Sequence, residues 1–194
     1  MKLAAITLAA TAGLAMASPV YDSIQNPQEH TYAPAAASTY TFDLSGIESW
    51  DGLGDPSNST LSQYFWPGFM VTQISWDITV STYGASWLSE ATVSFENTNQ
   101  TDGFFLTPGS GNDFPGTGTF SSGGPIDLLA EGLAFFLDGD GLLNLEFFES
   151  FDDVADSPDA IFLAGSNIKI YFLPTPGSLP VFGFAALAAT RRRR

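Results

Sequence analysis

Apolar and polar residues alternate with a period of two along several short segments of this chain. The clearest segment covers residues 74–81, where Ile74, Trp76, Ile78 and Val80 alternate with small polar residues and one aspartate. Because successive side chains of a β-strand point to opposite faces of a sheet, this alternation predicts a strand with one buried face. We expect these four apolar side chains to lie in the core.

Further segments repeat this pattern and predict strands beside the first one. Their inward-facing residues are predicted to be Ala91, Val93 and Phe95, then Leu143, Leu145 and Phe147, and finally Ile168, Ile170 and Phe172. The residues between them that are predicted to point outward include Asn144, Glu146, Lys169 and Tyr171. Shorter apolar runs predict three more strands, at residues 40–44 (with Tyr40, Phe42 and Leu44 inward), 104–106 and 133–137.

Turn-forming residues separate the predicted strands. Glycine and proline concentrate in segments such as 66–68, 107–113 and 138–141, which are typical of tight connections. No segment has a convincing 3.6-residue apolar period, and residues 127–131 allow one helical turn at most. Many short strands joined by such turns predict an all-β protein, a single antiparallel β-sandwich of jelly-roll-like form.

The amino-terminal segment differs from this pattern and predicts a secretory signal peptide at residues 1–17. Lys2 supplies the positive charge, an apolar stretch follows, and Ala15 and Ala17 form the small-x-small pattern of a cleavage site. We expect cleavage before Ser18. An alternative interpretation is a buried amino-terminal helix of a cytoplasmic domain.

Residues 18–38 contain three prolines and an alanine run and predict a flexible leader, so the β-sandwich domain is expected at residues 39–173. Cysteine is absent from the sequence. In an exported chain this excludes a disulfide scaffold, and a hydrophobic core must therefore stabilise the domain.

Acidic residues dominate the part of the chain between its two ends. All 21 acidic residues lie between Asp22 and Asp159, and Lys169 is the one basic residue outside the terminal segments, which leaves a formal charge of −20. Such a charge repels phosphate backbones and argues against nucleic acid as a partner. It favours Ca²⁺, because carboxylate oxygens are the ligands that this cation prefers.

Three acidic segments offer oxygen ligands for Ca²⁺. The candidate ligands are Asp138 and Asp140 in a tight turn, Asp152 and Asp153 in a cluster with Glu149, Asp156 and Asp159, and Asp51 and Asp55 in a glycine-rich segment. None of the three has the twelve-residue spacing of an EF-hand loop. Solvated acidic turns are therefore the alternative interpretation at each of them.

The residue types needed for nucleophilic or zinc chemistry are scarce. The single histidine, His30, lies in the predicted leader, so no base is available beside a nucleophile and no zinc ligand set is apparent. Paired carboxylates can serve a glycosidase, and exposed tryptophans can stack on sugar rings. Trp50, Trp66 and Trp87 lie near predicted loops and are candidates for such stacking, whereas Trp76 is expected in the core.

The carboxyl-terminal segment combines a proline motif, a short apolar stretch and a block of arginines. The motif comprises Pro174, Thr175, Pro176 and Gly177, and the block comprises Arg191, Arg192, Arg193 and Arg194. An apolar stretch followed by arginines engages a membrane, with the arginines on the cytoplasmic side. Residues 175–190 number only 16, against ~20 for a spanning helix. They predict a hydrophobic helix that inserts transiently, with a permanent anchor as the alternative.

This arrangement resembles the PEP-CTERM sorting signal of bacterial exported proteins. In that family a Val-Pro-Glu-Pro-like motif precedes a transmembrane-like segment and an arginine cluster, and Thr175 stands here where the family usually has glutamate. The resemblance implies passage through the export machinery and recognition by an exosortase, a membrane cysteine protease-transpeptidase. It also implies cleavage near the proline motif and delivery to the cell surface or extracellular matrix.

The segments 76–80, 87–89 and 146–153 are similar in pattern to the jelly-roll module found beside subtilisin-type proteases, a likeness that transfers no functional residues. The sequence thus favours a non-enzymatic exported β-sandwich whose acidic surface interacts with polysaccharide, Ca²⁺ or neighbouring copies. The alternative is a secreted carbohydrate-active enzyme of glycosidase type that uses paired carboxylates.

Overall fold

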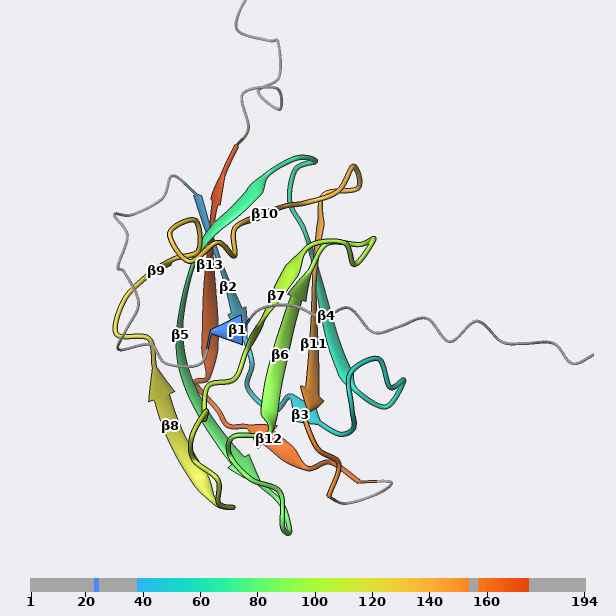
Figure 1. The fold of residues 1–194 in the computed structure, drawn as a ribbon, viewed down its shortest axis with the longest axis vertical. Coiled ribbons are helices and arrows are strands. Elements are labelled where there is room, and N and C mark those ends of the chain that lie inside the picture. The colour runs from blue at the N-terminus through green and yellow to red at the C-terminus, as the bar shows by residue number, and fades with distance from the viewer. Residues whose placement is uncertain (1–22, 25–37, 154–156, 175–194) are drawn as a thin grey trace, which may run out of the picture.

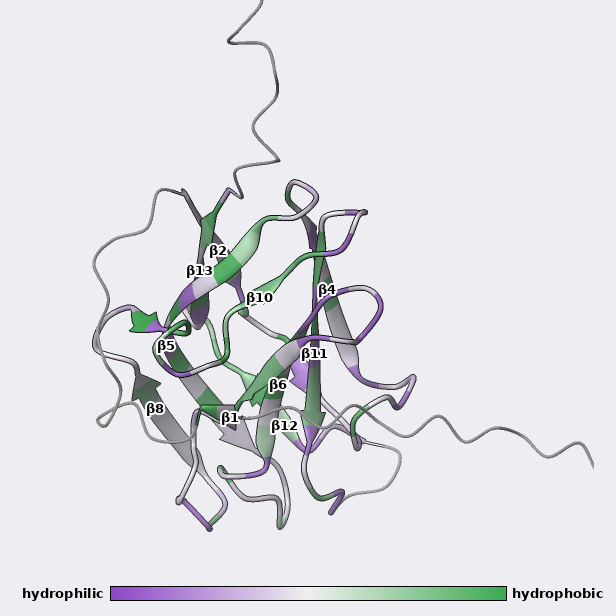
Figure 2. Cartoon of the chain, turned by 45° about the horizontal axis from the view of Figure 1, so that its top comes forward, coloured by the Kyte–Doolittle hydropathy of each residue, from purple (hydrophilic) through white to green (hydrophobic). Residues whose placement is uncertain are grey.

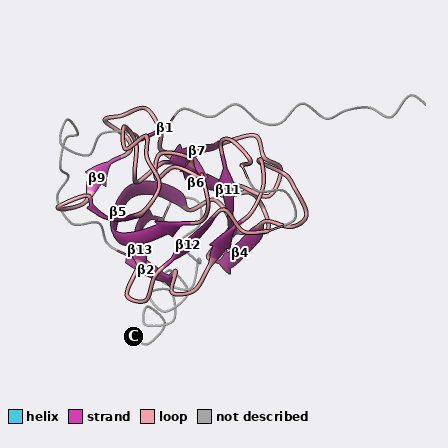
Figure 3. Ribbon diagram, turned by 90° about the horizontal axis from the view of Figure 1, so that it is seen from below, coloured by secondary structure: helices cyan, strands magenta, loops and turns pink. Residues whose placement is uncertain are grey.

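The computed structural model describes residues 23–24, 38–153 and 157–174 of the chain. In these ranges the chain forms thirteen strands and no helix, and the strands make two sheets that pack against each other (Figures 1 and 3). All strand pairs are antiparallel except the short pair β1–β7, which is parallel. The prediction of an all-β, antiparallel, two-sheet protein is confirmed.

The first sheet has five strands in the order β1–β7–β6–β11–β4. Their bounds are β1 Ser23–Ile24, β7 Gly103–Leu106, β6 Ala91–Glu96, β11 Leu142–Glu149 and β4 Ser59–Tyr64. The middle strand, β6, is buried at all six of its positions. Its two faces are therefore both covered, one of them by the second sheet.

The second sheet is organised around β5 (Met70–Thr82), whose thirteen residues span about 40 Å at the rise of an extended strand. One side of β5 pairs with β13 (Asn167–Leu173) and β12 (Ala160–Phe162), beyond which lie β2 (Ser38–Asp43) and β3 (Glu48–Ser49). The other side pairs with β8 (Thr117–Ser121), β9 (Ile126–Asp127) and β10 (Phe135–Phe136).

The apolar faces of the two sheets meet in one hydrophobic core. All the residues predicted to face inward on β5, β6, β11 and β13 are buried. Aromatic pairs join the sheets across the core: the ring centroids of Phe147 and Phe162 are 5.2 Å apart, and those of Phe104 and Phe135 are 6.2 Å apart. Figure 2 shows hydrophobic residues along β5, β10 and β11 and hydrophilic residues in several connecting loops.

Four details of the predicted pattern are wrong. Glu146 and Tyr171, predicted to point outward, are both 8 % exposed, and Tyr40, predicted to face inward, is 36 % exposed. Glu146 tolerates burial because its Oε1 accepts hydrogen bonds from Gly54 N, at 2.6 Å, and from Asn58 Nδ2, at 2.8 Å. Of the predicted strand at 133–137, only the two residues of β10 form a ladder.

Several predicted segments lie wholly or mostly outside the described residues. They include the signal peptide with Ala15, Ala17 and Ser18, His30 and most of the leader, Asp156, and the tail from Thr175 through Pro176 and Gly177 to Arg191, Arg192, Arg193 and Arg194. Pro174 is described and exposed, directly after β13. In the described ranges, no helix is long and apolar enough to cross a membrane.

Candidate functional site

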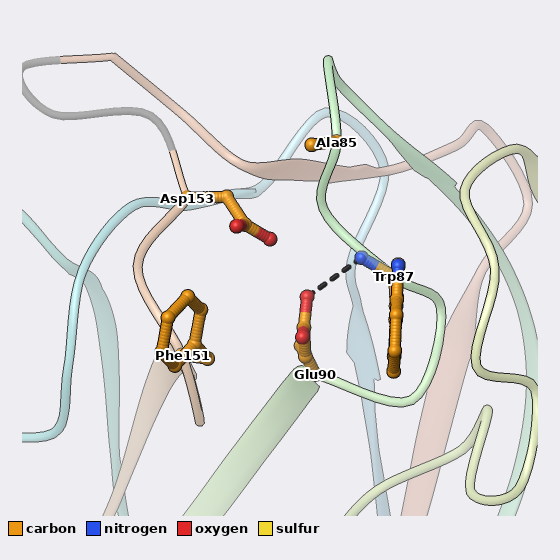
Figure 4. A pocket seen from close by; sticks show the side chains of 5 residues that line it. All are labelled: Ala85, Trp87, Glu90, Phe151 and Asp153. Atoms are coloured by element: carbon orange, nitrogen blue, oxygen red, sulfur yellow. Dashed lines mark hydrogen bonds between the residues drawn. The ribbon is translucent and has the colours of Figure 1, made fainter.

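A hollow of about 380 Å³ opens at the end of the two sheets that lies beyond Thr82, the last residue of β5. Two segments line it: residues 83–90, between β5 and β6, and residues 150–153, which follow β11. We call it the Trp87 cleft, and its lining residues are Ala85, Trp87, Glu90, Phe151 and Asp153 (Figure 4).

The β5–β6 loop holds Trp87 and Glu90 in a defined arrangement. Glu90 N donates to Trp87 O at 3.1 Å, and Glu90 Oε2 accepts the Trp87 N–H at 2.6 Å. These two reciprocal hydrogen bonds close a turn between the residues. Leu88 between them is buried in the core, at 1 % exposure. Because Leu88 points inward, the neighbouring Trp87 side chain is directed outward and stays 43 % exposed.

The β11–β12 loop supplies the opposite wall of the cleft. Ser150 N donates to Glu90 O at 3.0 Å, which ties the two loops together, and Phe151 next to it is 63 % exposed. Asp153 N donates to Asp159 Oδ2 at 3.2 Å. Figure 4 shows the Glu90 carboxylate between the Phe151 ring and the Trp87 indole, with the Asp153 carboxylate directed toward it.

Two further carboxyl groups are buried at this end of the sheets. Glu149, the last residue of β11, is 1 % exposed, and Asp159 is fully buried. The Ser49 hydroxyl donates to Glu149 Oε1, whereas Glu149 Oε2 has no hydrogen-bond partner among the described residues. A buried carboxyl oxygen without a partner is costly, most of all when the carboxyl group is ionised.

The carboxyl groups around the cleft disfavour one another's ionisation. Burial raises the pKa of Glu149 to about 8; the Ser49 hydroxyl opposes this shift, and the charges of Asp159, Glu90 and Asp153 add to it. Burial also raises the pKa of Glu90, opposed by the Trp87 N–H and reinforced by Asp153 and Asp159. The pKa of Asp159 is raised, chiefly by burial. A positive charge bound here would favour the ionised forms.

The structure brings together some of the residues predicted to bind Ca²⁺ and separates others. Asp153 lines the cleft and Asp152 is exposed beside it, while Asp51 O accepts the Glu149 N–H at 2.9 Å. Across the described part of the chain, no group of three or more histidine, aspartate and glutamate side chains is arranged to hold a metal ion. Calcium binding stays a prediction.

The other predicted ligands hydrogen-bond to main-chain N–H groups in turns. Asp138 Oδ2 accepts from Asn99 N at 2.8 Å, and Asp140 Oδ1 accepts from Leu142 N at 3.1 Å. Asp55 Oδ1 accepts from Ser57 N at 2.9 Å, and the Ser57 hydroxyl and N–H lower the pKa of Asp55. Bonds from Thr98 and Leu142 likewise lower the pKa of Asp140. Asp55 and Asp140 thus stabilise the turns in which they lie, and Asp138 connects its turn to the turn at Asn99.

Three of the four tryptophans divide as their positions in the sequence suggest, whereas Trp50 is half-buried. Trp76 is 2 % exposed, as predicted, whereas Trp66 is 63 % exposed and lies near Tyr64 in the β4–β5 connection, at the end of β5 opposite the cleft. Sequence reasoning missed Glu90. Glu90 lies three residues after Trp87, and at this spacing a glutamate side chain can reach back to a main-chain N–H. That spacing is the one sequence feature that indicates the hydrogen bond between Glu90 and Trp87.

Comparison with protein-family models finds no match to this chain, and comparisons with curated proteins and with solved structures find none either. The proposals that follow therefore depend on the residues of this chain and on the geometry of the Trp87 cleft.

Proposed function

We propose that this chain is the precursor of a non-enzymatic exported protein that binds extracellular polysaccharide through the Trp87 cleft. One observation carries the proposal: two exposed aromatic rings, Trp87 and Phe151, stand on either side of the Glu90 carboxylate in an open hollow. Aromatic walls with a few polar groups between them are typical of small-molecule and saccharide sites.

The chemistry of a sugar ring fits these groups. The apolar C–H face of a pyranose stacks on an aromatic ring, and its hydroxyl groups donate hydrogen bonds to carboxylates, which are strong acceptors. The segments that carry the two aromatic rings are joined by a main-chain hydrogen bond between Ser150 and Glu90, which connects the two walls. Binding therefore requires little ordering of the site, which favours affinity.

Export and sorting form the second part of the proposal. The signal-peptide pattern of residues 1–17 and the PEP-CTERM-like tail of residues 174–194 support a route through the export machinery and an exosortase-like enzyme to the cell surface or extracellular matrix. We also propose a jelly-roll-like topology, which is supported by the repeated crossing of the chain between the two sheets, for example from β4 to β5 and on to β6.

A secreted glycosidase is the second candidate, because the raised pKa of Glu149 is a property of general acids in such enzymes. Two observations favour binding instead. Glu149 is 1 % exposed, out of reach of a polymer, and the Asp153 carboxylate is directed toward the Glu90 carboxylate and helps to raise the pKa of Glu90. Glycosidases hold their carboxyl groups at least ~5 Å apart to admit the scissile bond.

Affinity electrophoresis of the secreted protein in gels that contain different polysaccharides tests the binding function. We expect retardation by at least one polysaccharide, lost in Trp87→Ala and kept in Trp66→Ala, which removes a more exposed indole at the other end. Equal retardation of the two variants would place the binding surface elsewhere. Release of reducing ends that Glu90→Gln abolishes would establish the glycosidase.

Mass spectrometry of the mature protein from its native host tests export and sorting. We expect a chain that begins at Ser18 and ends between Leu173 and Gly177. Retention of Arg191–Arg194 in the surface-located protein would contradict processing by a sorting enzyme.

A further inference from the structure

We infer that the Trp87 cleft recognises a protonated amino sugar, the unacetylated hexosamine unit of a cationic polysaccharide. The inference rests on the proposed polysaccharide-binding function and narrows it to one class of ligand. It follows from the charge of the cleft, from the spacing of its carboxyl groups and from the aromatic walls.

The cleft gathers negative charge for which the protein provides no counter-ion. Glu90 and Asp153 line it, and the buried Asp159 helps to raise the pKa of Glu90. Within the described ranges the one lysine or arginine is Lys169, which lies on β13 opposite Ser75, in the middle of β5 and away from the loops of the cleft. A cationic ligand would supply a positive charge that the protein itself does not place beside these carboxylates.

The spacing of the carboxyl groups suits an ammonium group better than a metal ion. A calcium ion needs six or more oxygens at 2.3–2.6 Å, and no three carboxyl side chains in the part of the chain that the structure describes meet that condition. An ammonium group has three N–H donors and reaches carboxylates at about 2.7–2.9 Å. The Glu90 carboxylate and the Asp153 carboxylate directed toward it offer the ammonium group two such acceptors.

The unpartnered oxygen of Glu149 points to the same ligand. Glu149 Oε2 is buried without a hydrogen-bond partner, and the Glu149 carboxyl interacts electrostatically with Glu90, Asp153 and Asp159. A cation held between Glu90 and Asp153 lowers the cost of ionising Glu149 behind them. A bound cation is therefore expected to lower the pKa of Glu149, whose carboxyl group is protonated at neutral pH in the free protein.

The aromatic walls favour an ammonium group carried on a sugar. Trp87 and Phe151 present exposed ring faces on both sides of Glu90, which suits a flat pyranose ring between them and adds cation–π attraction for its amine. Uronic-acid and sulfated polymers are repelled by a body with a formal charge of −20. A neutral sugar leaves the charge of Glu90 and Asp153 uncompensated.

Calorimetric titration of the secreted protein at about pH 6, where hexosamine amines are protonated, tests the inference. The probes are a β-1,4-linked glucosamine oligosaccharide, the fully N-acetylated oligosaccharide of the same length and a neutral glucan oligosaccharide. We expect the glucosamine oligomer to bind at least ten-fold more tightly than the other two, with an affinity that falls as NaCl is added. Glu90→Gln should remove this preference, Trp87→Ala should abolish binding of every oligomer, and Trp66→Ala should change neither.

Each other outcome has a distinct meaning. Equal, Trp87-dependent affinity for the acetylated and unacetylated oligomers would overturn the amino-sugar inference and leave the polysaccharide-binding function standing. Absence of binding to every oligomer would overturn both. Tighter binding of a lysine oligomer through Glu90 would assign the cleft to protein amines, and an absolute requirement for Ca²⁺ would assign it to a metal-bridged ligand.

Discussion

Ser49 on β3 donates a hydrogen bond to the carboxyl group of Glu149 at the end of β11, one hundred residues further along the chain. This bond connects the edge of one sheet with the central part of the other. Both side chains are buried, and burial raises the pKa of Glu149 to about 8 from an ordinary value of 4.5. At neutral pH this carboxyl group is therefore mostly protonated.

The Glu149 carboxyl makes the stability of the fold fall as pH rises. Between pH 4.5 and 8 the folded state binds a proton here that the unfolded state has lost, so this contribution is fully present below 4.5 and is lost as pH rises through 8. One such proton corresponds to about 1.4 kcal/mol of unfolding free energy per pH unit. We expect Glu149→Gln to remove this slope and to be more stable than the parent at pH 8, measured by urea unfolding across the pH range.

Glu48→Gln, on the half-buried part of β3, is the matched control for this measurement. Its stability should follow the pH dependence of the parent. Parallel curves for the parent and Glu149→Gln would show that Glu149 ionises normally in the folded protein.

The stacked pair Phe95–Phe104 is predicted to contribute strongly to stability. The two rings are 4.7 Å apart, with 11° between their planes, and both side chains are fully buried between the sheets. Phe95→Ala should lower the unfolding free energy by about 3–5 kcal/mol, because it removes buried apolar surface and leaves a cavity. Phe114→Ala, at a side chain that is 53 % exposed, should change it by less than about 1 kcal/mol. Similar losses in both variants would contradict this assignment.

Gly109 is expected to tolerate no side chain, because a Cβ atom there would lie 2.2 Å from Leu88 O. Gly109→Ala should displace the β5–β6 loop, lower the melting temperature and weaken polysaccharide binding, since Trp87 precedes Leu88. Gly52→Ala, where a Cβ atom meets nothing within 4 Å, should leave both properties unchanged. Thermal unfolding measures the first effect and affinity electrophoresis the second. Normal binding by a Gly109→Ala protein with a lowered melting temperature would show that Gly109 supports stability but not the Trp87 cleft.

Asn58 organises the segment that precedes β4. It is 8 % exposed, its Nδ2 donates to Gly52 O and to Glu146 Oε1, both at 2.8 Å, and its Oδ1 accepts from Asp51 N at 2.9 Å. Asn58→Ala leaves buried polar groups without this partner and should cost about 1–3 kcal/mol of unfolding free energy.

The control for this substitution is Asn144→Ala, which removes a solvent-exposed bond from the Ser62 hydroxyl. It should cost less than about 1 kcal/mol. An equal cost in the two variants, measured by chemical unfolding, would show that the Asn58 contacts do not determine stability.

The strands could be predicted from the sequence where their side chains obey one simple rule. The alternation along β5 suffices because every second residue faces the other sheet. Glu146 breaks the rule on β11, because Asn58 and Gly54, about ninety residues earlier, bury and satisfy its carboxylate. No local pattern indicates contacts over such separations.

The same limit applies to the cleft. Trp87 could be selected as an exposed aromatic because it lies in a predicted loop. Phe151 and Asp153 reach it from a loop some sixty residues later, through the hydrogen bond between Ser150 and Glu90. The pairing of those two loops is decided by the packing of the sheets that carry them.

The length of β5 has a consequence for how the protein meets its surroundings. Leu173 pairs with Met70 at one end of this strand, while the Trp87 cleft lies beyond Thr82 at the other, about 40 Å away. If the chain is joined to the cell through its carboxyl end, the cleft faces outward, roughly one bilayer thickness from the point of attachment. In that position it can engage polymer strands that do not touch the cell itself, so each attached copy would extend the reach of the cell into its matrix.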